Sequence, residues 1–438
     1  MNRKLKYLLF LLAAAMLVSG CAMRTVDEMY TPPKRSAEYQ DLQKAIDQAA
    51  PGVEYCAPLS GENQQTVQMA DLDGDGEEEY LLFARGSAEK PLQVLVFGRT
   101  EEGYALRETI ESSGSAFELV EYVDIDGKPG VELVIGRQVS NEVLRSVSVY
   151  SFSAGDAAQL MTANYSKFVT CDLDRNGLTE LMVIVPGSAE TDHAVAVLYS
   201  FSGDEMVRST EVNLSETNEN IKRIMVGDLQ DGVPAVYVAS SVAESAIITD
   251  VFAMKDDRFS NISLSNDLGT SVQTLRNYYI YADDIDNDGV LELPGLIPME
   301  PGTGVTDQYL IRWYAMDSAG RETDKMFTFH NLAGGWYLQL DEAWAQRLLV
   351  IQDGSSYALS LWDESRSNTE KIMTVYVLTG SERETAATEA GRFVLYRGDE
   401  VVYAALLEPE AAEYGINQDN LISSFHLIYR DWKTGETE

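Results

Sequence analysis

The chain has few of the residues that enzymes commonly use for chemistry. Its 438 residues include only three histidines and three cysteines. His193, His330 and His426 have no second histidine or cysteine at metal-ligand spacing, and no G-x-S-x-G, H-E-x-x-H or phosphate-loop motif occurs. These absences argue against zinc enzymes, nucleophilic hydrolases and nucleotide-dependent enzymes. We therefore expect no catalytic residues.

Basic residues are scarce as well. There are 33 lysines and arginines against 70 acidic residues, and the formal net charge is −37. Such a chain repels nucleic acid and anionic lipid headgroups, and it attracts cations. We expect no nucleic-acid partner.

An apolar segment opens the chain. Residues 1–20 combine three basic residues with an unbroken apolar stretch from Leu8 to Val18, which is too short to span a bilayer and typical of a signal peptide. The following Leu17-Val18-Ser19-Gly20-Cys21 resembles the bacterial lipobox. This resemblance implies cleavage before Cys21 and a diacylglycerol on its thiol. An ordinary signal peptide followed by a chance cysteine is the alternative.

The lipobox resemblance also implies a location. The protein would be exported and held by lipid alone on the outer face of the cell membrane, or on the outer membrane if the envelope has two. Residues 21–35 include Pro32-Pro33 and read as a tether, and apolar residues at helical spacing predict a short helix over 36–52. The remaining cysteines, Cys56 and Cys171, are permitted but not required to form a disulfide.

The body of the chain is repetitive. Five similar segments begin at Asp71, Asp124, Asp172, Asp228 and Asp284, at steps of 53, 48, 56 and 56 residues. A period near 50 is typical of propellers. Each period reads as four short strands, which in the first are residues 66–70, 79–85, 92–99 and 104–110. The pattern predicts an all-β fold: a β-propeller of four-stranded antiparallel blades over residues 53–438.

The number of blades depends on the C-terminal region. Strands at 336–340, 347–351, 357–362 and 372–378 make a sixth unit, and those at 393–396, 401–407 and 425–429 begin another. Residues 53–56 could supply its fourth strand and close a ring of seven blades, which we favour. Six blades plus a separate cap over 381–438 is the alternative.

Three of the five segments share the nine-residue pattern Asp-x-Asp-x-Asp/Asn-Gly-x-x-Glu. Positions 1, 3 and 5 place side-chain oxygens inside a tight curve, and glycine at position 6 takes the positive φ that the reversal needs. The carbonyl at position 7 and the carboxylate at position 9 can complete an all-oxygen shell of the kind calcium prefers. The candidate ligands are Asp71, Asp73, Asp75, Glu77 and Glu79; Asp172, Asp174, Asn176, Leu178 and Glu180; and Asp284, Asp286, Asp288, Val290 and Glu292.

These loops are not EF-hands, because position 12 carries no glutamate and the flanks read as strands. Over residues 60–330 they resemble the loops of FG-GAP or VCBS repeats. This resemblance implies an integrin-alpha-type propeller with up to three structural calcium ions; polar turns without an ion are the alternative. The second segment has Lys128 at position 5, and we expect its ammonium group to replace the ion. The fourth has lost most of its ligands.

We expect a binding module for a protein or glycan ligand. All five tryptophans lie in the last third of the chain, and Trp336, which follows Gly334-Gly335, is the candidate for an exposed ligand-binding ring. Packing between blades is the other interpretation of the tryptophans. A scaffold subunit of an envelope complex is the alternative function, and a propeller-type hydrolase or lyase is a third. A scaffold should show a broad apolar patch, whereas a glycan receptor should show a cleft with aromatic rings and polar groups.

Overall fold

The computed structural model describes residues 37–428, except 88, 140–143, 188–192, 243–245, 266 and 300–307. The expected signal peptide, the tether and Cys21 lie outside the described residues, so export and lipid attachment stay predictions. In the part of the chain that is described, no helix is long and apolar enough to cross a membrane.

The predicted N-terminal helix is confirmed as α3 (Ala37–Ala49). Leu42, Ala45 and Ile46 recur on one face of this helix and are buried. They pack against apolar side chains of the first sheet, including Leu82 and Phe97. The helix therefore covers the outer end of that sheet.

Six antiparallel sheets of four or five strands make up the described residues. Sheet 1 holds β1 (Val67–Ala70), β2 (Glu79–Arg85), β3 (Leu92–Thr100) and β4 (Gly103–Ser112), and sheet 2 holds β5 (Ala116–Val123), β6 (Glu132–Gln138), β7 (Arg145–Ser151) and β8 (Ala158–Tyr165). Sheet 3 holds β9 (Lys167–Cys171), β10 (Glu180–Val185), β11 (Val195–Ser202), β12 (Glu205–Arg208) and β13 (Val212–Asn213), and sheet 4 holds β14 (Ile221–Asp228), β15 (Pro234–Val242), β16 (Ala246–Lys255) and β17 (Arg258–Asn261).

The last two sheets exchange strands with the C-terminal region. Sheet 5 has the order β18 (Leu293–Ile297), β19 (Gln308–Met316), β20 (Glu322–Asn331), β21 (Trp336–Leu340) and β27 (Phe425–Leu427). Sheet 6 has the order β22 (Leu348–Asp353), β23 (Ser356–Trp362), β24 (Thr369–Thr379), β26 (Val401–Leu407) and β25 (Phe393–Arg397). The short helices α4 (Glu342–Ala345), α5 (Arg383–Ala386), η4 (Pro409–Tyr414) and α6 (Gln418–Ser424) lie among these strands.

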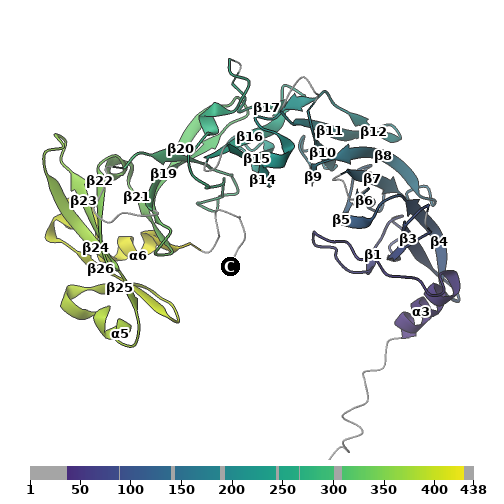
Figure 1. Ribbon diagram of the computed structural model, residues 1–438, viewed down its shortest axis with the longest axis horizontal. Helices are drawn as coiled ribbons and strands as arrows, with labels where there is room; N and C mark the ends of the chain where they lie inside the picture. The colour runs from purple at the N-terminus through teal and green to yellow at the C-terminus, as the bar shows by residue number, and fades with distance from the viewer. Residues whose placement is uncertain are drawn as a thin grey trace, which may run out of the picture.

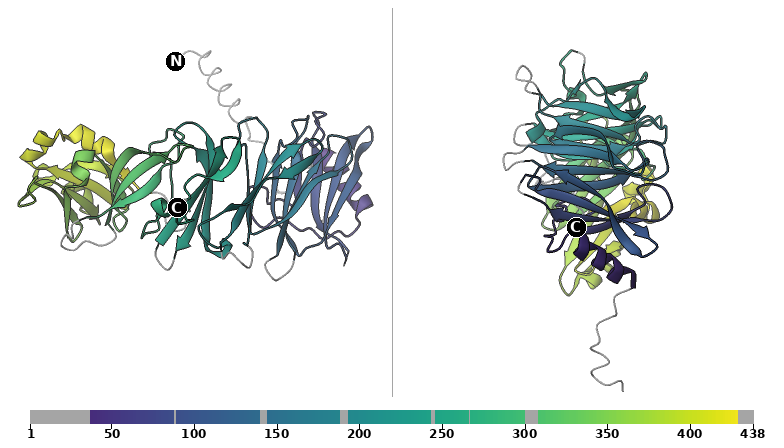
Figure 2. Two further views of the ribbon diagram at one scale, coloured as in Figure 1. Left: turned by 90° about the horizontal axis from the view of Figure 1, so that it is seen from above. Right: turned by 90° about the vertical axis from the view of Figure 1, so that its right-hand side faces the viewer.

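The sheets follow one another along an arc, with sheet 1 and sheet 6 at its opposite ends (Figures 1 and 2). In sheets 1 to 4 the first strand of each meander lies on the concave side and the fourth on the convex side (Figure 1). This is the blade arrangement of a propeller, so the predicted all-β propeller class is confirmed. The favoured number of seven blades is not confirmed by the six sheets described.

Two strand assignments in the prediction were wrong. Residues 53–56 do not close a last blade: Tyr55 pairs with Ala84, so the segment extends the edge of sheet 1 beside β2. The strand at 336–340 exists, but it pairs with β20 and so belongs to sheet 5 rather than to a sixth unit. Both errors concern long-range pairing, which strand periodicity does not encode.

The hydrophobic core lies between neighbouring sheets rather than in one centre. Val236 and Phe252 of sheet 4, for example, pack with Met182 and Leu198 of sheet 3. Equivalent apolar clusters join sheets 1 and 2, 2 and 3, 4 and 5, and 5 and 6. Each sheet is therefore held by its neighbours, as in other repeat architectures.

Candidate functional site: acidic loops and a C-terminal cleft

The first four acidic segments lie between the first and second strands of sheets 1 to 4, and the fifth precedes β18, the first strand of sheet 5. We call them loop 1 (residues 71–79), loop 2 (124–132), loop 3 (172–180), loop 4 (228–236) and loop 5 (284–292). In loops 1, 2, 3 and 5 the residues at positions 1, 3 and 9 each bring one carboxylate oxygen within 4.8 Å of the other two. These four groups of acidic residues could hold a metal ion. The nine-residue pattern thus correctly predicted that the side chains at positions 1, 3 and 9 converge.

Hydrogen bonds from backbone amides to side-chain carboxylates hold the loops in this shape. In loop 3 the two carboxylate oxygens of Asp172 accept from the amides of Asn176 and Gly177, at 3.1 and 3.0 Å. Gly177 has φ 89°, and the glycines at the same position of loops 1 and 5 have φ 87° and 90°. The expected positive φ at position 6 is confirmed. Asp284 accepts the same pair of bonds in loop 5, and Asp71 accepts from the amides of Gly74 and Gly76 in loop 1.

The glutamate at position 9 is buried in every one of these four loops. One of its oxygens accepts from the amide at position 2, at 3.0 Å for Glu79, 2.7 Å for Glu180 and 3.1 Å for Glu292. Each of these glutamates also contributes one carboxylate oxygen to the converging group of its loop. In loop 5 the oxygen of Glu292 that does not accept from the amide, Oε1, is fully buried and has no hydrogen-bond partner.

The side chain at position 5 holds the backbone of the loop, and its role as a ligand stays a prediction. The side-chain oxygens of Asp75, Asn176 and Asp288 accept from the amides at position 7, at 2.8, 2.7 and 2.9 Å. Asp75 and Asp288 do not belong to the converging groups. A role of the position 7 carbonyls of Glu77, Leu178 and Val290 as ligands stays a prediction.

Electrostatics make loops 3 and 5 unfavourable without a cation. Burial, together with the neighbouring aspartates of each loop, raises the pKa of Glu180 and of Glu292 to about 7. Burial also raises the pKa of Glu79, and the Arg107 guanidinium opposes that shift, as the Lys325 ammonium does for Glu292. A cation placed among these carboxylates would remove the repulsion.

Basic side chains contact the acidic residues of loops 1, 2 and 5. The sequence predicted this contact for loop 2 but not for loops 1 and 5. Arg107 of β4 contacts Asp73 and Glu79 in loop 1, and Lys325 of β20 contacts Asp288 in loop 5 at 2.8 Å. In loop 2 the Lys128 ammonium lies 3.1 Å from Asp126, which is the internal salt bridge that we expected. Among the described residues, no basic side chain pairs with the converging carboxylates of loop 3.

The loops also connect neighbouring sheets. The carbonyl at position 1 accepts a hydrogen bond from the amide at position 8 of the next loop in three cases: Val131 to Asp71, Thr179 to Asp124 and Leu291 to Asp228. Between loops 3 and 4, Arg175 instead pairs with Asp228. An ion that stiffened one loop would therefore stiffen a junction between two sheets.

Trp336 does not lie on a ligand-binding face, and that prediction was wrong. Its side chain is completely buried and packs against Phe329, Tyr357 and Phe425. The preceding glycines form the turn between β20 and β21, but the ring folds back into the core between sheets 5 and 6. Cys56 and Cys171 are both buried and free.

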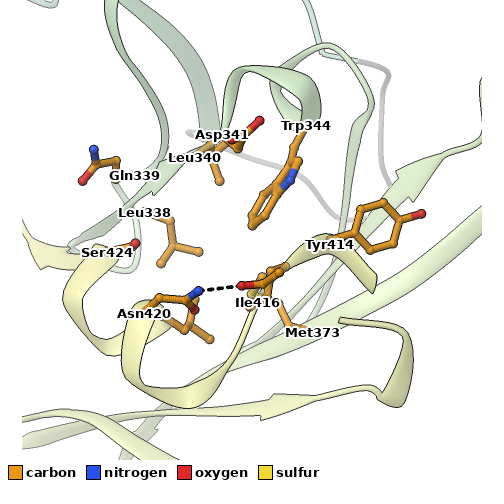
Figure 3. Close-up of a pocket in the computed structure, with 12 residues that line it drawn as sticks. Leu338, Gln339, Leu340, Asp341, Trp344, Met373, Tyr414, Ile416, Asn420 and Ser424 are labelled. Carbon is orange, nitrogen blue, oxygen red and sulfur yellow. Dashed lines mark hydrogen bonds between the residues drawn. The ribbon is translucent and has the colours of Figure 1, made fainter. Parts of the chain in front are cut away.

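A cleft of about 360 Å³ lies near the C-terminal end of the described chain. We call it the C-terminal cleft. Figure 3 shows the indole ring of Trp344 extending from α4 into the cleft, with Tyr414 at its side. The floor is apolar and the rim is polar; the floor contains Leu338, Leu340, Met373, Ile416 and Leu421, and the rim contains Gln339, Asp341, Asn420 and Ser424.

Hydrogen bonds fix the walls of the cleft. Asp341 caps α4 by accepting from the amide of Ala343 at 2.8 Å, which sets the helical turn that carries Trp344. The side-chain amide of Asn420 donates to the carbonyl of Gly415 at 2.7 Å (Figure 3). The Tyr414 hydroxyl donates to Glu370 at 2.8 Å. The sequence analysis did not single out Trp344 as a candidate ligand-binding residue, because only the packing of α4 distinguishes it from the buried tryptophans.

Comparisons with known proteins leave the family open. No family model matches the chain, and no curated protein does. Among solved structures it is similar to the exotype rhamnogalacturonan lyase YesX, at 14% identity and TM-score 0.31 over 73% of this chain and 68% of that one. It is also similar to the Dos1 propeller, at 12% identity and TM-score 0.30 over 81% of each chain.

A third similar structure is the β-propeller domain of the Trilobed protease from Pyrococcus furiosus, at 11% identity and TM-score 0.27 over 72% of this chain and 89% of that one. At these TM-scores the similarities carry no argument about function. The assignment of the architecture rests on the strand order and on the arrangement of the sheets.

Proposed function

We propose that this protein is a lipid-anchored, extracytoplasmic binding module whose ligand is a glycan that binds in the C-terminal cleft. The observation that carries the proposal is a single cleft lined by two aromatic residues, Trp344 and Tyr414, together with apolar and polar side chains. Aromatic rings offer apolar faces to a ligand, and a few placed polar groups select its orientation. A sugar presents both an apolar face and hydroxyl groups. We propose no catalytic role.

The cleft favours a glycan receptor over a scaffold subunit. A scaffold should offer a broad apolar patch. In the described residues, the exposed large apolar side chains are spread over many elements; they include Met69 on β1, Leu106 on β4, Val207 on β12, Ile351 on β22 and Ile422 on α6. The cleft instead combines aromatic, apolar and polar groups in one place.

Calcium is proposed as the structural cation of loops 3 and 5. Their converging donors are all carboxylate oxygens, as a hard divalent cation requires. The buried, unpartnered oxygen of Glu292 and the loop 3 carboxylates fit such an ion. When bound, calcium would neutralise the repelling carboxylates and stabilise the junctions between sheets. The residues that would hold it are Asp172, Asp174 and Glu180 in loop 3 and Asp284, Asp286 and Glu292 in loop 5.

The ligand is tested with full-length protein in detergent, applied to an array of neutral and acidic oligosaccharides. Any bound glycan is then titrated against Trp344→Ala and Tyr414→Ala. Each variant should weaken binding at least tenfold, which corresponds to about 1.4 kcal/mol. Tyr396→Ala is the matched control, because Tyr396 is an exposed aromatic residue on β25 that does not line the cleft. Binding of no glycan, or binding unaffected by the two cleft variants, would refute the proposal.

A further inference from the structure

Arg107 reaches loop 1 because of an irregularity in sheet 1. Along β3 and β4, Val96 pairs with Glu108 but Phe97 pairs with Leu106, so Arg107 is the extra residue of a β-bulge. A bulge re-aims the side chain that it carries. Gly98 leaves the necessary space, since a Cβ at Gly98 would lie 2.1 Å from Cδ of Arg107.

One nitrogen of Arg107 bridges two of the three converging carboxylates. Its Nη1 lies 2.8 Å from Oδ2 of Asp73 and 2.7 Å from Oε1 of Glu79. The second oxygen of Glu79 already accepts from the amide of Leu72, and both oxygens of Asp71 accept from loop amides. The loop amides supply equivalent bonds in loops 3 and 5. What distinguishes loop 1 is the positive charge that lies between two of its converging carboxylates.

Loop 5 also has a basic side chain from a β-bulge, but this side chain does not contact the converging carboxylates. Lys325 is also a bulge residue, because Trp313 pairs with Met326 while Tyr314 pairs with Asp324. Its ammonium group contacts Asp288 at position 5, outside the converging group. Oε1 of Glu292 is left without a partner. The three converging carboxylates of loop 5 thus have no ion pair with a basic side chain among the described residues, whereas two of those in loop 1 pair with Arg107.

We infer that Arg107 is a built-in cation that replaces the metal ion of loop 1. The protein then binds two calcium ions, in loops 3 and 5, instead of the three that the repeated sequence pattern predicts. The guanidinium group would repel a divalent cation and occupies the oxygens that the cation needs. Sheet 1 is therefore stable without metal, while the junctions around loops 3 and 5 depend on it. This inference rests on the proposed binding of calcium to the loops.

The test is equilibrium dialysis of metal-free, full-length protein in detergent against radioactive calcium. Wild type should bind two ions, and Arg107→Gln, which removes the charge, should bind three. Arg107→Lys should still bind two. Arg208→Gln is the matched control and should also bind two. Arg208 lies on β12 at one edge of sheet 3, and in the part of the chain that is described its guanidinium forms an ion pair only with the exposed Glu211.

Two further variants keep the test decisive if Arg107→Gln does not fold. Glu79→Gln should leave the stoichiometry at two, whereas Glu292→Gln should lower it to one. Three ions in wild type, a loss of one ion in Glu79→Gln, or two ions in a folded Arg107→Gln would overturn the inference. No bound calcium in wild type would refute the calcium proposal itself, and with it the inferred stoichiometry.

Discussion

Gly74 of loop 1 lies so close to Pro129 of loop 2 that a Cβ on Gly74 would stand 2.3 Å from the carbonyl carbon of Pro129. The acidic loops thus touch across the boundary between sheets 1 and 2. Because each sheet has core contacts only with its neighbours, such boundaries determine whether the arc holds together.

Gly74→Ala should therefore be strongly destabilising, and Gly76→Ala should be much less so. Both glycines have positive φ, so both substitutions carry a backbone cost of about 1 kcal/mol. Only Gly74 has neighbouring backbone in the way, since a Cβ on Gly76 meets nothing within 4 Å. We expect a further loss of about 1–3 kcal/mol for Gly74→Ala. Urea unfolding of both variants measures the difference, and equal losses would show that the loops do not press against each other.

Calcium should raise the melting temperature of the protein. An ion that binds only the folded state stabilises it by about 2.7 kcal/mol per site at a concentration one hundred times its Kd. Thermal unfolding in EDTA and across a calcium titration measures this shift. The double variant Glu180→Gln, Glu292→Gln should lose the response. A flat titration for wild type would mean that the loops are polar turns without an ion.

Lys128→Asp should create one additional calcium site in loop 2. It removes the ammonium group that now pairs with Asp126 and restores an oxygen at position 5. The carboxylates of Asp124, Asp126 and Glu132 already converge. Equilibrium dialysis should detect one more ion than in wild type, and Lys128→Gln serves as a variant that loses the charge without adding a carboxylate. An unchanged stoichiometry in Lys128→Asp would exclude the idea.

Trp336→Ala should act on stability rather than on ligand binding. The completely buried indole packs against three aromatic rings, so its removal should cost about 3–5 kcal/mol. Trp344→Ala should cost less, because Trp344 is only partly buried. Chemical denaturation of both variants gives the comparison. A Trp336→Ala variant as stable as Trp344→Ala would contradict the packing described above.

His330 should make the protein less stable in mild acid. Its imidazole is fully buried, and burial holds its pKa well below the ordinary value of 6.5. Below pH 6.5 the unfolded chain binds a proton that the folded chain does not. The free energy of unfolding should therefore fall, by up to about 1.4 kcal/mol per pH unit.

The variant His330→Phe should reduce this slope between pH 6.5 and 5. Phenylalanine keeps a ring that can stack on Tyr337, whose centroid lies 4.7 Å from that of the imidazole. Thr328→Val removes the hydrogen bond to Nε2 but keeps the titrating group, so it should preserve the slope. If His330→Phe retained the wild-type slope, the acid sensitivity would have to come from another group.

Much of the fold and part of the candidate site could be predicted because they depend on short stretches of chain. The strands of sheet 1 lie within a few residues of their expected positions, since turn residues and apolar runs mark them locally. Positions 1, 3 and 9 of the loops converge as their spacing indicated. The cleft could not be found in this way, because it brings Leu338, Met373 and Ile416 together from distant segments.

Nine residues suffice to specify an acidic loop, because its hydrogen bonds close between its own side chains and its own amides. They do not specify which loop receives a cation from the protein. That depends on a bulge in a strand about thirty residues later, on the space beside Gly98, and on the register between β3 and β4. The burial of Trp336 and the partial exposure of Trp344 follow from sheet packing in the same way. Local backbone geometry determines where carboxylates gather, and long-range packing determines what they meet there.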